Sequence, residues 1–212
     1  EDLTFGLCVN GFTTQDKVLC KSGMKKGDVL ILTKSLGTGT LLAADMRSKA
    51  SHLNIQNALN EMAISNQEAS SILLRMKATA CTDITGFGLA GHLIEMLMKD
   101  NIEVSITLDV IPIMNGALYS LKQGVFSSLH ADNRTVSSYI SGKSNLVEMA
   151  RYEILFDPQT SGGQLASIPS ELAAICLNQL LEAGYESASV IGKVSNINTD
   201  EPKITIEKPR DS

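Results

Sequence analysis

Apolar and polar positions change their period several times along this chain, and each period predicts a type of element. Short apolar runs with β-branched or alternating residues predict strands at 3–9, 28–33, 103–108, 164–167, 190–194 and 203–206. Apolar residues at helical spacing predict helices at 41–50, 65–76, 89–99 and 171–182. Because strands and helices mix without a strict β-α-β alternation, we expect an α+β fold, a layered mixed β-sheet covered by helices.

Two of the predicted helices carry further local detail. Ser65 and Glu68 have the spacing of a capping box, which predicts that a helix begins there. The apolar stripes that we expect to be buried are Ala69, Ile72, Leu73 and Met76 in this helix, and Leu172, Ile175, Cys176 and Leu180 in the helix at 171–182.

Composition excludes several classes of protein. The 212 residues are 43% hydrophobic and 19% charged, as in ordinary globular proteins, and they are enough for one good core or for one domain plus a remnant of another. A net charge of -5 and the lack of any basic run argue against a nucleic-acid partner. No apolar stretch approaches the ~20 residues that cross a bilayer, and no signal peptide precedes the first strand. We therefore expect no membrane partner and a cytoplasmic location.

The cysteines support the same location. They are widely separated, with no C-x-x-C pair and no histidine at ligand spacing, which favours reduced thiols over disulfides or a zinc site. The four residues are Cys8, Cys20, Cys81 and Cys176.

The most informative stretch is the glycine-rich sequence that follows Asp83. Gly86, Gly88 and Gly91 form a turn that opens into a predicted helix, and glycine lets backbone N–H groups approach a phosphate closely. A carboxylate beside such a turn can hold the Mg²⁺ that accompanies phosphates, because hard cations prefer oxygen ligands.

The same glycines match the dinucleotide fingerprint G-x-G-x-x-G of a Rossmann-type domain. In that alternative, Asp109 lies close to the ~20-residue offset of a ribose-binding acid. Against it, the run at 83–85 is polar, whereas that fold has a buried apolar strand before the first glycine. The flanking segments also lack β-α-β repetition.

A second dense motif spans residues 157–163. Its Asp-Pro pair starts a turn, Thr160 and Ser161 offer hydroxyl groups, and Gly162 and Gly163 let the backbone bend sharply. From this chemistry alone, the segment is either a polar loop before a strand or one wall of a binding site.

The histidines give weaker signals. His130 follows a polar cluster and is either a general base or, as is commoner for a lone loop histidine, a hydrogen-bonded bystander. His92 follows the last glycine of the turn, and there we expect a structural role in which the ring bonds to a neighbouring carbonyl.

These motifs together resemble one family. The run 81–92 resembles the C-T-D-[VI]-T-G-F-G-L-x-G-H signature of selenophosphate synthetases (selenide, water dikinases), and 157–163 is similar to their D-P-Q-T-S-G-G. The segment 27–39 resembles their G-D-x-L-x-L-T-K-P-L-G-T-G, with Ser35 where Pro is common. Met62-x-x-x-Asn66 and the segment 6–11 follow in the expected order. The resemblance covers essentially the whole chain.

The resemblance implies part of a two-domain enzyme of the aminoimidazole-ribonucleotide-synthetase-like superfamily. That family uses Mg²⁺ and ATP with selenide and water to make selenophosphate, AMP and orthophosphate, and its members are expected to be homodimers. Residues 1–22 would be the last strand of the N-terminal domain plus a linker, and 23–212 the C-terminal domain. The predicted strand at 3–9 has no earlier partner in the sequence, which agrees with this division.

The resemblance also sets the expected site. The family's reactive Cys or selenocysteine and its essential Lys belong to the N-terminal domain, and neither Cys8 nor Cys20 has a Gly-Cys-x-x-Lys setting. We therefore expect no catalytic residue here and an inactive fragment. Asp83 matches a Mg²⁺-binding position. The residues expected to line the ATP site are Thr82, Thr85, Gly86 and Gly88 on one loop, and Thr160, Ser161, Gly162 and Gly163 on the other. A non-catalytic regulatory paralogue remains an alternative.

Overall fold

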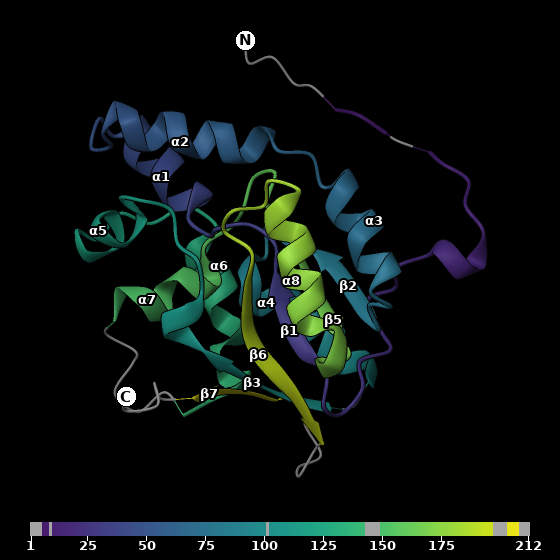
Figure 1. Ribbon diagram of the computed structural model, residues 1–212. Helices are drawn as coiled ribbons and strands as arrows, with labels where there is room; N and C mark the ends of the chain where they lie inside the picture. The colour runs from purple at the N-terminus through teal and green to yellow at the C-terminus, as the bar shows by residue number, and fades with distance from the viewer. Residues whose placement is uncertain (1–5, 9, 101, 143–148, 197–202, 208–212) are drawn as a thin grey trace.

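A mixed β-sheet runs through the part of the chain that the computed structural model describes, which comprises residues 6–8, 10–100, 102–142, 149–196 and 203–207 (Figure 1). Within it the strand order is β2-β5-β1-β6-β3-β7-β4. The strands are β1 Val29–Leu32, β2 Ala80–Asp83, β3 Ile102–Thr107, β4 Ile140–Ser141, β5 Gln164–Ile168, β6 Ser189–Asn196 and β7 Lys203–Glu207.

The pairing pattern decides between the two folds that the glycine motif allows. The neighbours from β2 to β3 are antiparallel, and β7 is parallel to both β3 and β4. A Rossmann-type domain has a mostly parallel sheet with helical crossovers, so the dinucleotide-binding alternative is wrong. Asp109, its expected ribose ligand, instead lies 3.8 Å from the Arg151 side chain. The predicted α+β class with a layered mixed sheet is confirmed.

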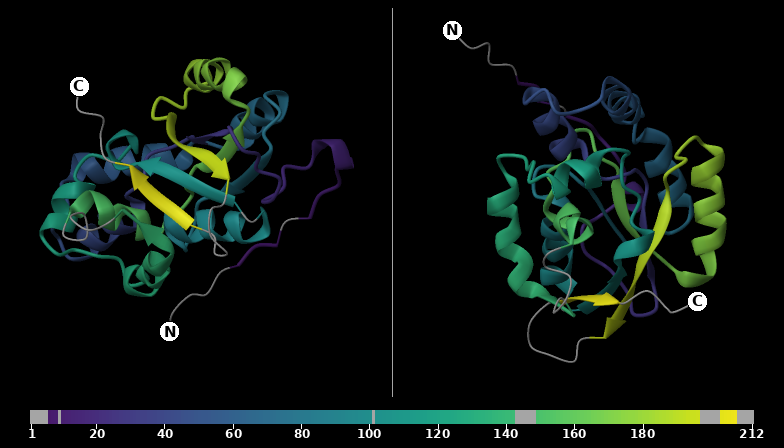
Figure 2. Two further views of the ribbon diagram at one scale, coloured as in Figure 1. Left: turned by 90° about the horizontal axis from the view of Figure 1, so that it is seen from below. Right: turned by 90° about the vertical axis from the view of Figure 1, so that its left-hand side faces the viewer.

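Helices cover both faces of this sheet (Figure 2). Along β1, Ile31 packs into a cluster with α3 and α8, whereas Leu30 and Leu32 face the larger cluster that contains α4. This alternation follows from the period of two in a strand. The α-helices are α1 Thr38–Met46, α2 His52–Ala63, α3 Gln67–Arg75, α4 Gly88–Asp100, α5 Ala117–Lys122, α6 His130–Asn133, α7 Ala150–Glu153 and α8 Ala173–Glu182.

Short 3₁₀ segments complete the described elements. They are η1 Gln15–Lys17, η2 Leu108–Val110, η3 Arg134–Tyr139, η4 Ile154–Phe156 and η5 Ser170–Leu172. No described helix is long and apolar enough to cross a membrane.

Several local predictions need correction. Of the strand predicted at 3–9, residues 6–8 are exposed and unpaired with the described sheet, and the remainder lies outside the described residues. An extended segment becomes a strand only when another strand pairs with its backbone. The helix predicted at 41–50 ends at Met46, just before Ser48 takes a left-handed conformation with φ 55°. The structure adds α2, where the apolar pattern predicts no element.

The predicted capping box does not form. The Ser65 hydroxyl accepts the N–H of Gln67 at 3.1 Å, Asn66 is the N-cap residue, and Glu68 lies 3.5 Å from Arg75. The predicted burial of Ile175 is also wrong, because its side chain is 51% exposed on the outer side of α8. The other three residues of that stripe pack on or within the cluster beneath the helix.

Candidate functional site

Three loops meet at one end of the sheet because β5 lies antiparallel between β1 and β2. Asp83, the last residue of β2, pairs with Gln164, the first residue of β5, and Leu32 at the end of β1 pairs with Leu165. The segments that follow β1 and β2 therefore lie beside the segment 157–163 that precedes β5. The structure thus brings together the two motifs that the sequence singles out.

The glycine turn after β2 contacts the 157–163 loop directly. The N–H of Ile84 donates to the carbonyl of Gly163 at 2.8 Å, and the N–H of Gln159 donates to the carbonyl of Thr85 at 2.9 Å. Gly88 has φ +69°, and a Cβ there would lie 2.9 Å from the Leu155 carbonyl oxygen. Only glycine meets both conditions without strain.

Asp157 and Gln159 anchor the second loop inside the protein. The Thr40 hydroxyl donates to Asp157 Oδ1 at 2.7 Å, and Gln159 Nε2 donates to Asp157 Oδ2 at 3.0 Å. Gln159 Oε1 accepts from the Thr38 hydroxyl, which in turn accepts the N–H of Thr160. Burial raises the pKa of Asp157 to about 6. These two polar residues of the motif therefore bond to the protein itself.

The predicted site residues divide into exposed and internal groups. Asp83, Thr160 and Ser161 are exposed, whereas Gly162 and Gly163 are buried. Thr82 is also buried, and its hydroxyl donates to the Asp83 carbonyl at 3.2 Å. Its side chain therefore shapes the strand end and does not line the site.

Both loops carry backbone N–H donors that make no hydrogen bond to described residues. Among the described residues, no hydrogen bond is found from the N–H groups of Thr85, Gly86, Phe87, Ser161, Gly162 and Gly163. Successive N–H groups without partners form concave sites for anions. The donors belong to the two segments that the sequence predicts to bind phosphate.

His92 has the structural role that its position predicts, with different partners. Its Nε2 lies 3.0 Å from the Thr85 hydroxyl and its Nδ1 lies 3.2 Å from Glu95, so neither nitrogen bonds to a carbonyl. Burial lowers the pKa of His92, and the Glu95 carboxylate opposes this shift. Lys21 bonds Glu95 at 3.0 Å and completes the cluster. Thr85 is thus held by the helix that follows the turn.

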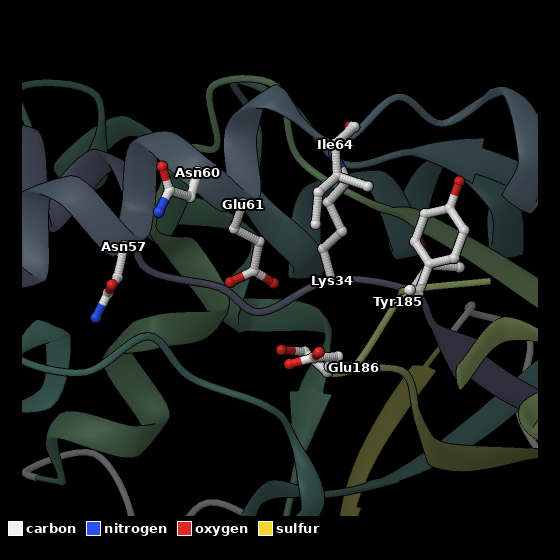
Figure 3. A pocket seen from close by; sticks show the side chains of 10 residues that line it. Lys34, Asn57, Asn60, Glu61, Ile64, Tyr185 and Glu186 are labelled. Atoms are coloured by element: carbon white, nitrogen blue, oxygen red, sulfur yellow. The ribbon is translucent and has the colours of Figure 1, made fainter. Parts of the chain in front are cut away.

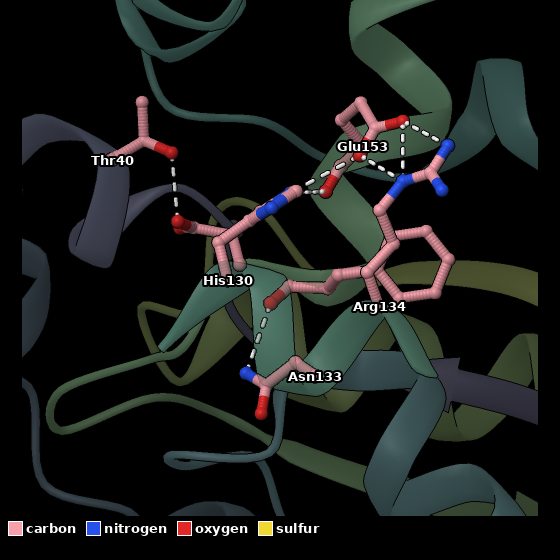
Figure 4. Close-up of polar contacts among 7 residues, drawn as sticks. Thr40, His130, Asn133, Arg134 and Glu153 are labelled. Carbon is pink, nitrogen blue, oxygen red and sulfur yellow. Dashed lines mark hydrogen bonds and ion pairs between the residues drawn. The ribbon is translucent and has the colours of Figure 1, made fainter. Parts of the chain in front are cut away.

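His130 is buried and its ring is directed toward Glu153 (Figure 4), which places it among the structural histidines. Its Nε2 lies 3.2 Å from the Glu153 carboxylate, and Arg134 bonds the same carboxylate at 3.0 Å. The neighbouring Asn133 donates its amide to the Gly86 carbonyl at 2.7 Å. This cluster supports the glycine turn from inside.

Two functional candidates were missed by sequence reasoning, Lys34 and Asn66. The Lys34 side chain extends toward Ile64 (Figure 3), and its Nζ donates to the carbonyls of Ile64 at 2.6 Å and Ser161 at 3.2 Å. Asn66 Nδ2 donates to the Gly162 carbonyl at 2.9 Å. The available signal in the sequence was that Lys34 follows the predicted buried strand at 28–33. A lysine that is buried at such a position needs acceptors inside the protein.

Two cavities flank these loops. One of about 380 Å³ lies beside Lys34 and is lined by polar groups that include Glu61 and Glu186 (Figure 3). The other, of about 460 Å³, is bordered by Gly86 and Thr160 of the two loops and by Arg47 of the segment after α1. Of the residues with unused N–H groups, Gly86 borders the second cavity, which is large enough for a small ligand.

The site also contains oxygen donors that suit a hard cation. Asp83 offers an exposed carboxylate, and the buried side-chain oxygens Oδ1 of Asn66 and Oε1 of Gln164 accept no hydrogen bond from described residues. Carboxylate and amide oxygens are typical Mg²⁺ ligands. Among the described residues, no group of three or more His, Cys, Asp and Glu side chains is arranged to hold a metal. Asp83 fits a cation that is shared with other ligands.

The sequence pattern described as "AIR synthase related protein, C-terminal domain" matches residues 25–204. The chain belongs to this family.

Relatives of this AIR synthase related domain share a name. The chain is 38% identical over 180 residues to "Selenide, water dikinase" of Treponema denticola, covering 84% of this chain and 50% of that protein. It is 38% identical over 196 residues to the protein of the same name from Bdellovibrio bacteriovorus, covering 92% of this chain and 55% of the relative. The domain thus spans about half the length of these curated relatives.

Solved structures confirm the fold of the AIR synthase related domain. Hydrogenase maturation protein HypE in complex with ATP matches with a TM-score of 0.63 at 18% identity, over 92% of this chain and 52% of that one. Thiamine-monophosphate kinase from Stenotrophomonas maltophilia matches with a TM-score of 0.60 at 15% identity, over 88% and 52% of the two chains. At these identities the likeness concerns the fold alone.

Proposed function

We propose that this chain is the C-terminal domain of a selenophosphate synthetase, which converts selenide, ATP and water to selenophosphate, AMP and orthophosphate. The observation that carries the proposal is the convergence of the 84–88 turn and the 157–163 loop, in a chain whose curated relatives are named selenide, water dikinase. Both loops offer unused N–H donors to phosphate oxygens.

In this proposal the domain contributes to binding Mg²⁺ and ATP. Asp83 holds Mg²⁺, which neutralises negative charge on the phosphoryl groups when bound. The N–H groups of Thr85, Gly86 and Ser161 bind phosphate oxygens, and Gly88 permits the tight turn that presents them. Asp157 and Gln159 keep the second loop in place, so they act on binding through the loop backbone.

The remaining parts of the proposal concern the whole protein. Residues 1–22 connect to an N-terminal domain that supplies the nucleophile, and 23–212 form the C-terminal domain. The complete enzyme is a cytoplasmic homodimer, and the 212-residue chain alone is inactive because most phosphate and metal ligands come from the other domain.

The test follows selenide-dependent conversion of ATP to AMP and selenophosphate by phosphorus NMR in the N-terminally completed protein. Wild-type enzyme should form selenophosphate, and Asp83→Asn should reduce the rate strongly because the amide removes the negative charge that holds the cation. Unchanged activity in Asp83→Asn would mean that Asp83 does not bind the cation and that this loop has only a structural role. Absence of activity in both proteins would favour a non-catalytic regulatory paralogue instead.

A further inference from the structure

Lys34 and Asn66 bind two successive carbonyl groups of one loop. Lys34 Nζ donates to the Ser161 carbonyl at 3.2 Å, and Asn66 Nδ2 donates to the Gly162 carbonyl at 2.9 Å. The two donors come from different parts of the chain, the segment after β1 and the N-cap of α3. Both side chains therefore hold the backbone of the same three residues.

This arrangement fixes the direction of the N–H groups that follow. In a trans peptide unit the C=O and the next N–H point in opposite directions. Capture of the Ser161 carbonyl thus directs the Gly162 N–H away from Lys34, and capture of the Gly162 carbonyl directs the Gly163 N–H away from Asn66. These N–H groups are among those from which no hydrogen bond is found in the described part of the chain.

An unpaired N–H in a buried residue calls for a ligand. Gly162 and Gly163 are both buried, and a buried backbone donor without a partner costs free energy comparable to a lost hydrogen bond. Ser161 also has a left-handed φ of 49°, a conformation that is uncommon for residues other than glycine. A left-handed residue followed by consecutive free donors is a feature of anion-binding nests.

Lys34 itself is a costly residue to bury. Only 3% of it is exposed, and burial lowers its pKa. Its Nζ bonds the Ile64 carbonyl at 2.6 Å as well as the loop. The Tyr185 hydroxyl bonds the next carbonyl of the same turn, that of Ser65, at 2.7 Å. The lysine is therefore held to a turn that is itself tied to the protein.

We propose that 161–163 form an oxyanion cradle that binds a phosphoryl group through its backbone N–H groups, and that Lys34 and Asn66 are positioning residues that orient it. Naming the phosphoryl group as the ligand rests on the proposed function. The group belongs either to bound ATP or to free orthophosphate. Lys34 and Asn66 need not touch the ligand, because they act through the carbonyls.

The sequence permits a direct test on this chain. Gly162-Gly163 is its only Gly-Gly pair, so labelling with carbonyl-¹³C glycine and ¹⁵N glycine selects the Gly163 amide alone. We expect this resonance to shift when inorganic phosphate is added up to about 50 mM against chloride at matched ionic strength, a range that detects a Kd of about 1 mM. Mg·ATP is titrated in parallel. A shift with phosphate assigns the cradle to free orthophosphate as well, and a shift with Mg·ATP alone assigns it to the nucleotide.

Variants separate positioning from folding. Asn66→Asp keeps the size of the side chain but replaces the donor with an acceptor, and Lys34→Met removes the cationic donor. Each should weaken the Gly163 response at least tenfold, whereas Lys34→Arg should restore part of it. Lys26→Met, at an exposed position, removes the same charge and should leave the response unchanged. Folding of each variant is checked by the other glycine resonances.

Two results would overturn the cradle. One is a Gly163 amide that stays unmoved by both ligands in the wild type, and the other is a folded Asn66→Asp that responds like the wild type. The proposed function fails by a different result, the absence of selenide-dependent AMP formation in the complete enzyme. If the cradle binds phosphate but the complete enzyme lacks that activity, the cradle is supported and only the proposed function fails.

Discussion

The side-chain amide of Asn133 lies 2.7 Å from the carbonyl oxygen of Gly86 and 3.0 Å from that of Phe156. One buried residue of α6 thus joins the glycine turn to η4, the segment just before the 157–163 loop. These two hydrogen bonds, together with the direct contacts between the loops, fix the position of the glycine turn relative to the 157–163 loop.

Asn133→Ala should destabilise the protein by about 1–3 kcal/mol, because both carbonyls lose a buried donor. Urea unfolding of the two proteins measures the difference. Asn57→Ala, on the exposed surface of α2, is the matched control and should stay within about 0.5 kcal/mol of wild type. Equal effects of the two substitutions would show that the bridge contributes nothing specific.

Gly88→Ala should destabilise the protein more than Gly124→Ala does. The two glycines have nearly the same φ, +69° and +70°, so the backbone strain of alanine, about 1 kcal/mol, is common to both. A Cβ at Gly88 would lie 2.9 Å from the Leu155 carbonyl, whereas one at Gly124 meets nothing within 4 Å. The difference in unfolding free energy between the two variants measures the cost of the close contact at Gly88. A difference of zero would contradict the prediction that this contact is destabilising.

Asp157 should make stability fall as the pH rises from about 4 to 6. Burial raises the pKa of the folded carboxyl to about 6, while the unfolded chain releases this proton near pH 4. The folded state therefore holds the extra proton within this window, and its relative stability decreases by about 2–3 kcal/mol across it. Carboxyls with a lowered pKa, such as that of Glu153, act in the opposite direction.

The comparison that isolates this effect is Asp157→Asn, which carries the same other carboxyls but no titrating group at this position. Unfolding free energies of the two proteins, measured at intervals from pH 4 to 7, should differ in slope. The variant should gain on the wild type as the pH rises. Parallel profiles would mean that Asp157 titrates alike in both states.

Tyr185→Phe should destabilise the protein by about 1–3 kcal/mol, since it leaves the buried N–H of Ala69 without an acceptor. The Tyr185 hydroxyl accepts that N–H at 2.8 Å and donates to Ser65 at 2.7 Å. Tyr119 is 65% exposed, so Tyr119→Phe is the control and should have little effect on the melting temperature. A silent Tyr185→Phe would refute the anchoring role of the hydroxyl.

The strands of the central sheet were largely predictable, because their apolar runs are short and buried. The run at 28–33 became β1, and 164–167 became β5, each within one residue at either end. The strand predicted at 3–9 was different, because an extended segment forms a strand only if another strand pairs with it, and the apolar pattern does not reveal such a partner. Ile175 failed for a related reason, since helical spacing defines a stripe but not its exact width.

For the site, the sequence identified the two loops but not what holds them. The glycines of these loops could be predicted as turn residues because turn chemistry depends on residue type, whereas the Mg²⁺-binding role of Asp83 stays a prediction. Lys34 and Asn66 bond backbone carbonyls more than 90 residues away, because Gly162 lies 96 positions beyond Asn66 and Ser161 lies 127 beyond Lys34. The Lys34 contact follows from the pairing of β5 with β1, and the Asn66 contact from the packing of α3 beside β5, neither of which a local pattern contains.

The internal position of Asp157 and Gln159 changes how paralogues of this domain should be judged. Their side chains bond Thr38 and Thr40 and so maintain the structure of the loop. A homologue without phosphoryl-transfer activity would still need both residues for this structure. The Asp83 side chain is exposed, so the structure of the loop does not depend on it in the same way. If the proposed role of Asp83 is correct, a homologous sequence that keeps Asp157 and Gln159 but lacks Asp83 has the loop structure without the cation ligand.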